Sequence, residues 1–224
     1  MNNKLESYNK KNSDDPTCYK CDCSNYCSTG RPSRELENCP IKTSPEIQKK
    51  AIELYETDDF IKRSNFAATV AKSQGIVSRL RNAIEYAKAM GFKKLGIASC
   101  GGLQTETRKT AEILLHYGFE VSSVSCPTGI NKKINAEIPE EFTGYSKMGC
   151  NFNYISCNPV AQALLLNNAK TDMNIIIGLC VGHDVTFTHL SNAPVITLIA
   201  KDWVIPHNPS ETLNSFYKEI RLKL

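Results

Sequence analysis

The chain has 224 residues, a formal net charge of +4 and ten cysteines. Its length suits one medium α/β domain with a core of its own and a small appendage. The charge is small, no basic tract is interleaved with aromatic residues, and no apolar run reaches the length of a membrane span, so neither nucleic acid nor a membrane is expected as a partner.

Residues 1–15 are polar and lack the apolar centre of a secretory signal. We therefore expect a disordered tail on a cytoplasmic protein. In a reducing cytosol, clustered cysteines indicate metal binding or redox chemistry rather than disulfides.

A cysteine-rich segment follows at residues 16–42 and holds five of the ten cysteines among few apolar side chains. Such a segment cannot fold by burial alone and would need a metal to order it. The spacing C-x₂-C-x-C-x₃-C-x₁₁-C contains a paired knuckle that is typical of metal sites. The predicted ligands are Cys18, Cys21, Cys27 and Cys39, with Cys23 as an alternative. Structural zinc, a [4Fe–4S] cluster and a metal-free, redox-active tail all stay open.

A helical segment is predicted for residues 43–92. Pro45 suits the first position of a helix, and apolar residues follow it at helical spacing. Asp58 is expected to cap a second helix, which runs with an interruption to Met90 and stops at Gly91.

The remainder, residues 93–224, alternates strands with helices. Strands are predicted at 93–100, 119–126, 174–180 and 193–200, helices at 105–117, 158–168 and 183–190, a loop at 127–154 and a last helix from Pro209. Alternation of this kind requires parallel pairing, so the segment predicts a Rossmann-like, three-layer α/β domain.

Three of the predicted strands end on a cysteine, namely Cys100, Cys126 and Cys180, and Cys157 lies just before the cap of the following helix. In a parallel sheet all carboxyl ends lie at one edge, here called the rim, and ligands bind in the crevice there. We therefore expect these four thiols to share one site, although each by itself would also suit a small apolar core position. Cys150, in the predicted loop, is either a fifth member or an exposed thiol.

Soft thiolate ligands select iron–sulfur clusters or zinc, and four of them suit a cluster held by cysteines only. Gly101, Gly102 and Gly182 are expected to let a ligand approach the backbone and to offer it amide donors. His183 is a candidate ligand or catalytic proton donor, or simply the first residue of a short helix. Asp184 would orient that imidazole or cap the helix.

Several runs carry a family resemblance. They are AIEYAKAMGFKKLGIASCGGL (83–103), GFEVSSVSC (118–126), NCPIK (38–42), and the CNP and GLCVGHD motifs within 157–202. They are similar to a bacterial and archaeal family described as a predicted metal-binding domain of unknown function, number 1847, over nearly the whole chain from Cys18 to Pro209. The resemblance implies a metal or cluster held by the strand-end and amino-terminal cysteines, and it supplies no reaction. A weaker, architectural analogy exists with the Rossmann-like cluster-binding domains of hybrid-cluster and carbon monoxide dehydrogenase proteins.

The leading hypothesis is an iron–sulfur protein of anaerobic redox metabolism, with one amino-terminal [4Fe–4S] cluster and one at the rim. An incompletely ligated rim cluster would make it an oxidoreductase in which His183 moves a proton. We expect a redox partner protein or a small-molecule substrate, and a homo-oligomer. The alternatives are a zinc-binding module without catalysis, with Zn²⁺ at the amino-terminal site, and a cysteine-dependent thiol or sulfur-transfer enzyme. Nucleotide binding is disfavoured, because SCGGLQTET lacks both G-x-G-x-x-G and a phosphate-loop lysine.

Overall fold

The computed structural model of the chain describes residues 16–21, 27, 30–32, 36–129 and 157–222. Cys23, Cys150, the predicted tail and most of the predicted loop lie outside these residues. The chain divides into two units, residues 1–66 and 67–224, and each is described by itself. The predicted helical segment is therefore shared between the two units. Within the described ranges, no helix is both long enough and apolar enough to cross a membrane.

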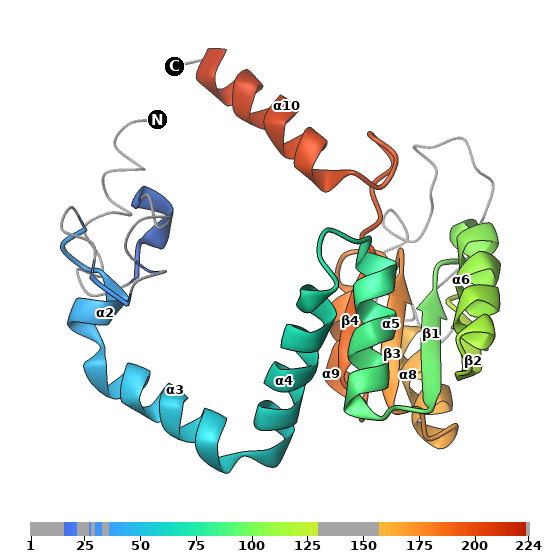
Figure 1. Ribbon diagram of the computed structural model, residues 1–224. Coiled ribbons are helices and arrows are strands. Elements are labelled where there is room, and N and C mark those ends of the chain that lie inside the picture. The colour runs from blue at the N-terminus through green and yellow to red at the C-terminus, as the bar shows by residue number, and fades with distance from the viewer. Residues whose placement is uncertain (1–15, 22–26, 28–29, 33–35, 130–156, 223–224) are drawn as a thin grey trace. The chain divides into compact units, whose positions relative to one another are not determined.

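The first unit consists of short elements and long polar helices (Figure 1). They are η1 (Cys18–Lys20), α2 (Pro40–Thr43), α3 (Pro45–Thr57) and the first half of α4 (Asp59–Ser73). Pro45 opens α3, and Asp58 caps α4 by accepting a hydrogen bond from the amide of Ile61 at 2.9 Å, as predicted. Among the described residues from 16 to 57, only Leu36 and Cys39 are buried. The unit therefore has very little apolar core.

The second unit is an α/β domain around a four-stranded parallel sheet, which confirms the predicted fold class. Its strands are β1 (Lys94–Ser99), β2 (Glu120–Ser125), β3 (Met173–Ile177) and β4 (Val195–Ile199), in the spatial order β2-β1-β3-β4. Its helices are α5 (Arg79–Met90), η4 (Gly101–Leu103), α6 (Gln104–His116), α8 (Pro159–Asn168), α9 (His183–Leu190) and α10 (Pro209–Leu222).

Sequence signals fix the ends of these helices as predicted. Gly91 ends α5 in the left-handed conformation, with φ of 75°. The side chain of Asn158 accepts a hydrogen bond from the amide of Ala161 at 3.0 Å, and Pro159 occupies the first turn of α8. Helix α8 therefore begins directly after Cys157.

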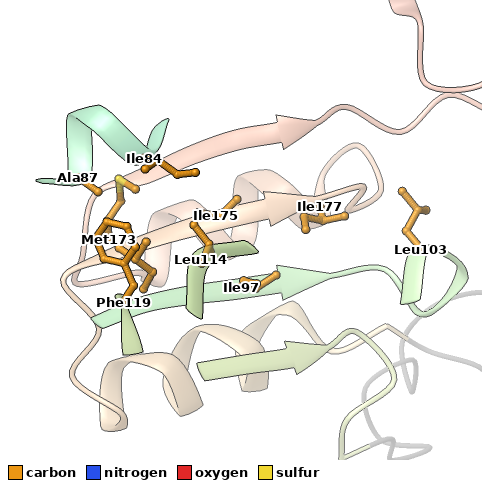
Figure 2. Packing of buried hydrophobic residues seen from close by; sticks show 10 residues of the cluster. Ile84, Ala87, Ile97, Leu103, Leu114, Phe119, Met173, Ile175 and Ile177 are labelled. Atoms are coloured by element: carbon orange, nitrogen blue, oxygen red, sulfur yellow. The ribbon is translucent and has the colours of Figure 1, made fainter. Parts of the chain in front are cut away.

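Helices cover both faces of the sheet, so the domain has three layers (Figure 1). Helices α5 and α6 pack on one face, where the buried side chains are Ile84, Ala87, Leu95, Ile97, Leu103, Leu114, Phe119, Met173, Ile175 and Ile177 (Figure 2). Helices α8 and α9 pack on the other, where the buried side chains are Ala98, Cys126, Ala163, Leu166, Ile176, Leu179 and Phe187. The domain thus buries a substantial apolar core on each side of the sheet.

Close packing on the α8 face depends on one glycine in the sheet. A Cβ atom at Gly96 would collide with the side-chain oxygen of Asn174 and lie 3.1 Å from Leu166. Asn174 cannot move aside easily, because it is fully buried, accepts a hydrogen bond from Thr171 at 2.8 Å and donates one to Ser191 at 2.8 Å. Gly96 therefore lets β1 approach this buried polar group.

The order of the strands places a topological switch point between β1 and β3. From β1 the chain passes through α6 to β2 on one side, and it returns through α8 on the opposite face to β3 on the other side. Ligands of open parallel sheets bind at such a switch point, beyond the carboxyl ends of the strands. The four strand-associated cysteines belong to the segments that leave or enter the sheet at this point.

Candidate metal centre at the rim of the sheet

The hydrogen-bond ladder of the sheet continues one residue past the strands and holds two of the cysteines in place. The amide of Cys100 donates to the carbonyl of Ile177 at 2.9 Å, and the amide of Cys126 donates to the carbonyl of Ser99 at 2.8 Å. The amide of Asn158 then donates to the carbonyl of Cys126 at 2.7 Å, which brings Cys157 to the same edge. Two of these positions continue the pairing of the strands, and the third is set by a backbone contact between the end of β2 and the cap of α8.

Cys180 reaches the rim by a different route. The strand β3 ends at Ile177, three residues earlier than the predicted end, because Gly178 turns the chain with φ of 64°. A Cβ atom at Gly178 would lie 2.9 Å from Leu103, so only glycine fits this turn. The carbonyl of Cys180 then accepts hydrogen bonds from the amides of His183 and Asp184 at 3.0 and 3.1 Å, so α9 starts directly behind the thiol.

The four cysteines, here called the rim cysteines, lie in a ring with a lysine. Cys100 is hydrogen-bonded to Cys126, and Cys157 is hydrogen-bonded to Cys180. The sulfur atoms of Cys126 and Cys157 are 3.6 Å apart. The ammonium nitrogen of Lys201 closes the ring, at 2.7 Å from the sulfur of Cys180 and 3.5 Å from that of Cys100. These contacts link the four predicted strand-end cysteines in one cluster, and their binding of a common ligand stays a prediction.

Lys201 was not predicted from the sequence. It lies two residues after β4, and a lysine that follows a strand carries no pattern that separates it from a surface lysine. The indole of Trp203 lies next to it, with its ring centre 5.9 Å from the lysine nitrogen. The same indole packs over Gly102, where a Cβ atom would lie 3.4 Å from it and 3.8 Å from the sulfur of Cys100.

Protonated and ionised sulfurs alternate around the ring. The hydrogen bonds from Cys100 and then Cys157 lower the pKa of Cys126 to about 2, against the effect of burial. The hydrogen bond from Cys157 lowers the pKa of Cys180 to about 5, and Lys201 adds to this effect, again against burial. The hydrogen bond that Cys100 donates to Cys126 raises the pKa of Cys100, and the single S–H of Cys157, shared between Cys126 and Cys180, raises the pKa of Cys157; burial raises both further. Near neutral pH the ring thus holds two thiolates and two thiols.

The charge of Lys201 matches these thiolates. Burial acts to lower the pKa of its ammonium group, but the hydrogen bond with Cys180 and the negative charge of that thiolate raise it overall. The lysine therefore stays charged inside the ring and offsets part of its negative charge.

His183 adds a fifth donor. One ring nitrogen of His183 and the sulfurs of Cys157 and Cys180 all lie within 4.8 Å of one another, a grouping that can hold a metal ion. The Nδ1 atom is buried and has no hydrogen-bond partner among the described residues. A metal ion or a proton would give this buried imidazole nitrogen, close to two sulfurs, the partner that it lacks among the described residues.

Backbone amides near the ring were expected to be available to a ligand, and this expectation is met only in part. The amide of Gly101 points at the ring and donates to the sulfur of Cys126 at 3.4 Å. The amide of Gly182 was expected to be open to a ligand, and this is wrong, since it donates to the carboxylate of Asp184 at 2.9 Å. Asp184 also accepts from the amide of Val185 at 2.8 Å and therefore caps the start of α9.

The amino-terminal cysteines differ from this arrangement. Cys18 and Cys27 are exposed, Cys21 is partly exposed and Cys39 is buried. Of the described residues, only Cys157, Cys180 and His183 form a group of three potential ligand atoms as close as 4.8 Å. The amino-terminal ligand set, with Cys23 outside the described residues, stays a prediction.

Comparisons with known proteins identify a family and add no reaction. A family model described as a protein of unknown function (DUF1847) matches residues 39–198. An uncharacterized protein of Methanocaldococcus jannaschii, MJ0455, is 35% identical over 208 residues, which cover 92% of this chain and 96% of that protein. No solved structure matches.

Proposed function

The chain belongs to the DUF1847 family of unknown function, and we propose that its rim binds a redox-active iron centre through the four rim cysteines. The observation that carries the proposal is the ring of four thiols and Lys201, drawn from separate segments of the chain, at the carboxyl edge of the sheet. Active sites of open parallel sheets lie at this edge.

The donor set fits a thiolate-ligated metal. A tetrahedral ion with metal–sulfur bonds of about 2.3 Å has sulfur–sulfur edges of about 3.8 Å. The separation of 3.6 Å between Cys126 and Cys157 is close to this edge. No three of the four rim sulfurs lie within 4.8 Å of one another, so a single ion would have to draw the thiols closer together. A [4Fe–4S] cluster, the form predicted from the sequence, is larger and needs the sulfurs farther apart.

Two features favour iron over zinc, namely the apolar core of the domain and the four-thiolate coordination of the site. Structural zinc orders segments that lack a core, whereas the α/β domain buries two apolar clusters of its own. Catalytic zinc needs an open position beside three protein ligands, whereas four thiolates close the tetrahedron. A closed thiolate site at this edge of the sheet supports electron transfer, the chemistry that iron supplies when bound.

The surrounding residues have separate roles in this proposal. Cys100, Cys126, Cys157 and Cys180 would hold the centre. The amide of Gly101 donates to the sulfur of Cys126 and stabilises its negative charge. His183 lies close enough to hold a proton beside Cys157 and Cys180, or to replace a sulfur as ligand. The amino-terminal cysteines would hold a second metal, either zinc or a cluster.

The test is metal and acid-labile sulfide analysis of the full chain, purified without oxygen, combined with electron paramagnetic resonance. Cys157→Ser is compared with Ser123→Ala, a control at an exposed position of β2. We expect Cys157→Ser alone to lose the rim iron, with sulfide distinguishing a cluster from a single ion. Zinc at the rim in place of iron, or unchanged iron in Cys157→Ser, would contradict the proposal.

A thiol or sulfur-transfer enzyme is the second candidate, and the lowered pKa of Cys180 beside Lys201 favours it. It predicts that iodoacetamide modifies Cys180 in the anaerobic protein as purified while the metal content is unchanged. The iron proposal predicts protection of Cys180 until the metal is removed. One alkylation experiment therefore separates the two candidates.

A further inference from the structure

We propose that Lys201 is a positioning residue that supplies a fixed positive charge and two hydrogen bonds to the thiolates of the rim centre, and so favours its reduced form. This inference rests on the proposed iron centre. It gives a function to a residue that no sequence motif marks and that closes the ring of thiols.

The geometry places the ammonium group of Lys201 between two cysteines of different strands. Its nitrogen lies 2.7 Å from the sulfur of Cys180, which follows β3, and 3.5 Å from the sulfur of Cys100, which follows β1. Both distances are within the range of hydrogen bonds to sulfur. Lys201 therefore spans the switch point at the side where no cysteine bridges Cys180 to Cys100.

A braced loop fixes this position. The carboxylate of Asp202 accepts hydrogen bonds from the amides of Val204 and Ile205 at 2.8 and 3.3 Å and from the hydroxyl of Thr212 at 2.7 Å. The carbonyl of Asp202 accepts from the amide of His207 at 3.0 Å. The residue next to Lys201 is thus held by four hydrogen bonds, which limits the movement of the lysine backbone.

The same loop places an aromatic wall beside the lysine. The ring of Trp203 lies 5.9 Å from the lysine nitrogen and packs on its other side against His207, with ring centres 5.4 Å apart. An ammonium group near an indole face keeps its charge and loses some of its freedom. The indole therefore adds a contact that holds the ammonium group beside the two sulfurs.

A fixed cation at this distance changes the relative stability of the reduced and oxidised forms of the centre. One electron from an external donor adds one negative charge to an iron centre held by four thiolates. A positive charge within a few ångströms stabilises that form more than the oxidised form, because the Coulomb energy grows with the charge of the centre. Hydrogen bonds to the sulfurs act in the same direction, since sulfur carries part of the added charge.

The test is a potentiometric titration of the iron-loaded full chain, reduced with dithionite and oxidised with ferricyanide. Lys201→Met removes the charge and keeps the length, and Lys201→Arg keeps the charge. Lys93→Met is the matched control, because Lys93 lies at the amino end of β1, about 20 Å of strand away from the rim. At a fixed potential, we expect the ratio of reduced to oxidised centre to fall at least tenfold in Lys201→Met, which is about 59 mV for one electron.

Lys201→Arg should recover most of the lost reduction, and Lys93→Met should match the unmodified chain. Loss of iron from Lys201→Met with retention in Lys201→Arg would also support the inference, because arginine keeps the charge and the hydrogen-bond donors that methionine lacks. Equal potentials in Lys201→Met and the unmodified chain, or equal loss of iron from both Lys201 variants, would overturn it. Absence of iron from the unmodified chain would overturn the proposed function itself, so the two failures are distinguishable.

Discussion

The two cysteine-bearing regions of the molecule place their thiols by different means. At the rim, backbone hydrogen bonds that continue the sheet hold Cys100 and Cys126, and the cap of α8 holds Cys157 beside them. In the amino-terminal segment, the described elements are a three-residue η1 and a four-residue α2, and Leu36 and Cys39 alone among the described residues of 16–42 are buried. The first site is built by folding, whereas the second has little apolar burial to build it.

This difference teaches that cysteine spacing alone does not say what a metal does. Close spacing, as in the amino-terminal segment, occurs where the metal replaces a missing core. Wide spacing, with one cysteine per strand, occurs where a core already exists and the sheet brings the thiols together. We therefore expect the amino-terminal metal to have a structural role and the rim metal to have a chemical role.

Removal of metal should separate the two regions most strongly. After treatment with a chelator, we expect the amides of residues 16–42 to exchange hydrogen as fast as in an unfolded peptide. The amides of β1 and β3 should keep their protection, because two apolar clusters cover them. Hydrogen exchange measured by mass spectrometry on the full chain checks this. Equal loss of protection in both regions would remove the distinction.

The pH dependence of metal binding sharpens the account of the rim. The pKa values of Cys100 and Cys157 are raised, so both bind a proton at neutral pH, whereas those of Cys126 and Cys180 are lowered to about 2 and about 5. A metal that takes four thiolates must then displace two protons.

The affinity of the rim should consequently rise about a hundredfold for each pH unit between 6 and 8. Competition of Co²⁺ against a chelator of known affinity measures it, in a variant that lacks Cys18 and Cys39 and so reports the rim alone. A change in affinity that corresponds to four released protons would mean that all four rim cysteines are thiols before metal binds. An affinity that hardly changes with pH would mean that none of them is a thiol.

A substitution that disturbs the packing of the sheet should have the smallest effect, and it should change stability only in the region that contains the rim. Gly96→Ala would press a methyl group against Asn174 and Leu166, so we expect the free energy of unfolding of the α/β domain to fall by about 2 kcal/mol. Urea unfolding followed by the fluorescence of Trp203, the single tryptophan of the chain, measures it. Ser123→Ala is the control, and hydrogen exchange in residues 16–42 should not change. An unaltered unfolding curve would show that Asn174 is not held as tightly as its hydrogen bonds indicate.

Local sequence signals were enough to predict the elements of the α/β domain. Periodicity and caps such as Asn158 and Gly91 gave the helices, and alternation with strands gave the parallel sheet. Cys100 and Cys126 were predicted at strand ends because a residue directly after a strand must lie at the edge of the sheet. Cys180 was predicted as the last residue of its strand, whereas the strand ends three residues earlier, because the left-handed Gly178 was included in it.

Interactions set by the fold could not be predicted in this way. Lys201 joins the ring only because β4 pairs with β3, which brings a residue of one segment beside Cys180 of another. The amide of Gly182 is occupied because Asp184, two residues later, folds back on it. Both contacts depend on where the folded chain places its residues, and the sequence around one residue does not show this.

The most direct test of the central claim is X-ray absorption at the iron edge of the anaerobic protein, in the variant that lacks Cys18 and Cys39. We predict a first shell of four sulfurs at about 2.3 Å, as expected for a centre held by the rim cysteines. A shell made mainly of nitrogen or oxygen, or a spectrum that does not change when Cys126 and Cys157 are both replaced by serine, would contradict it.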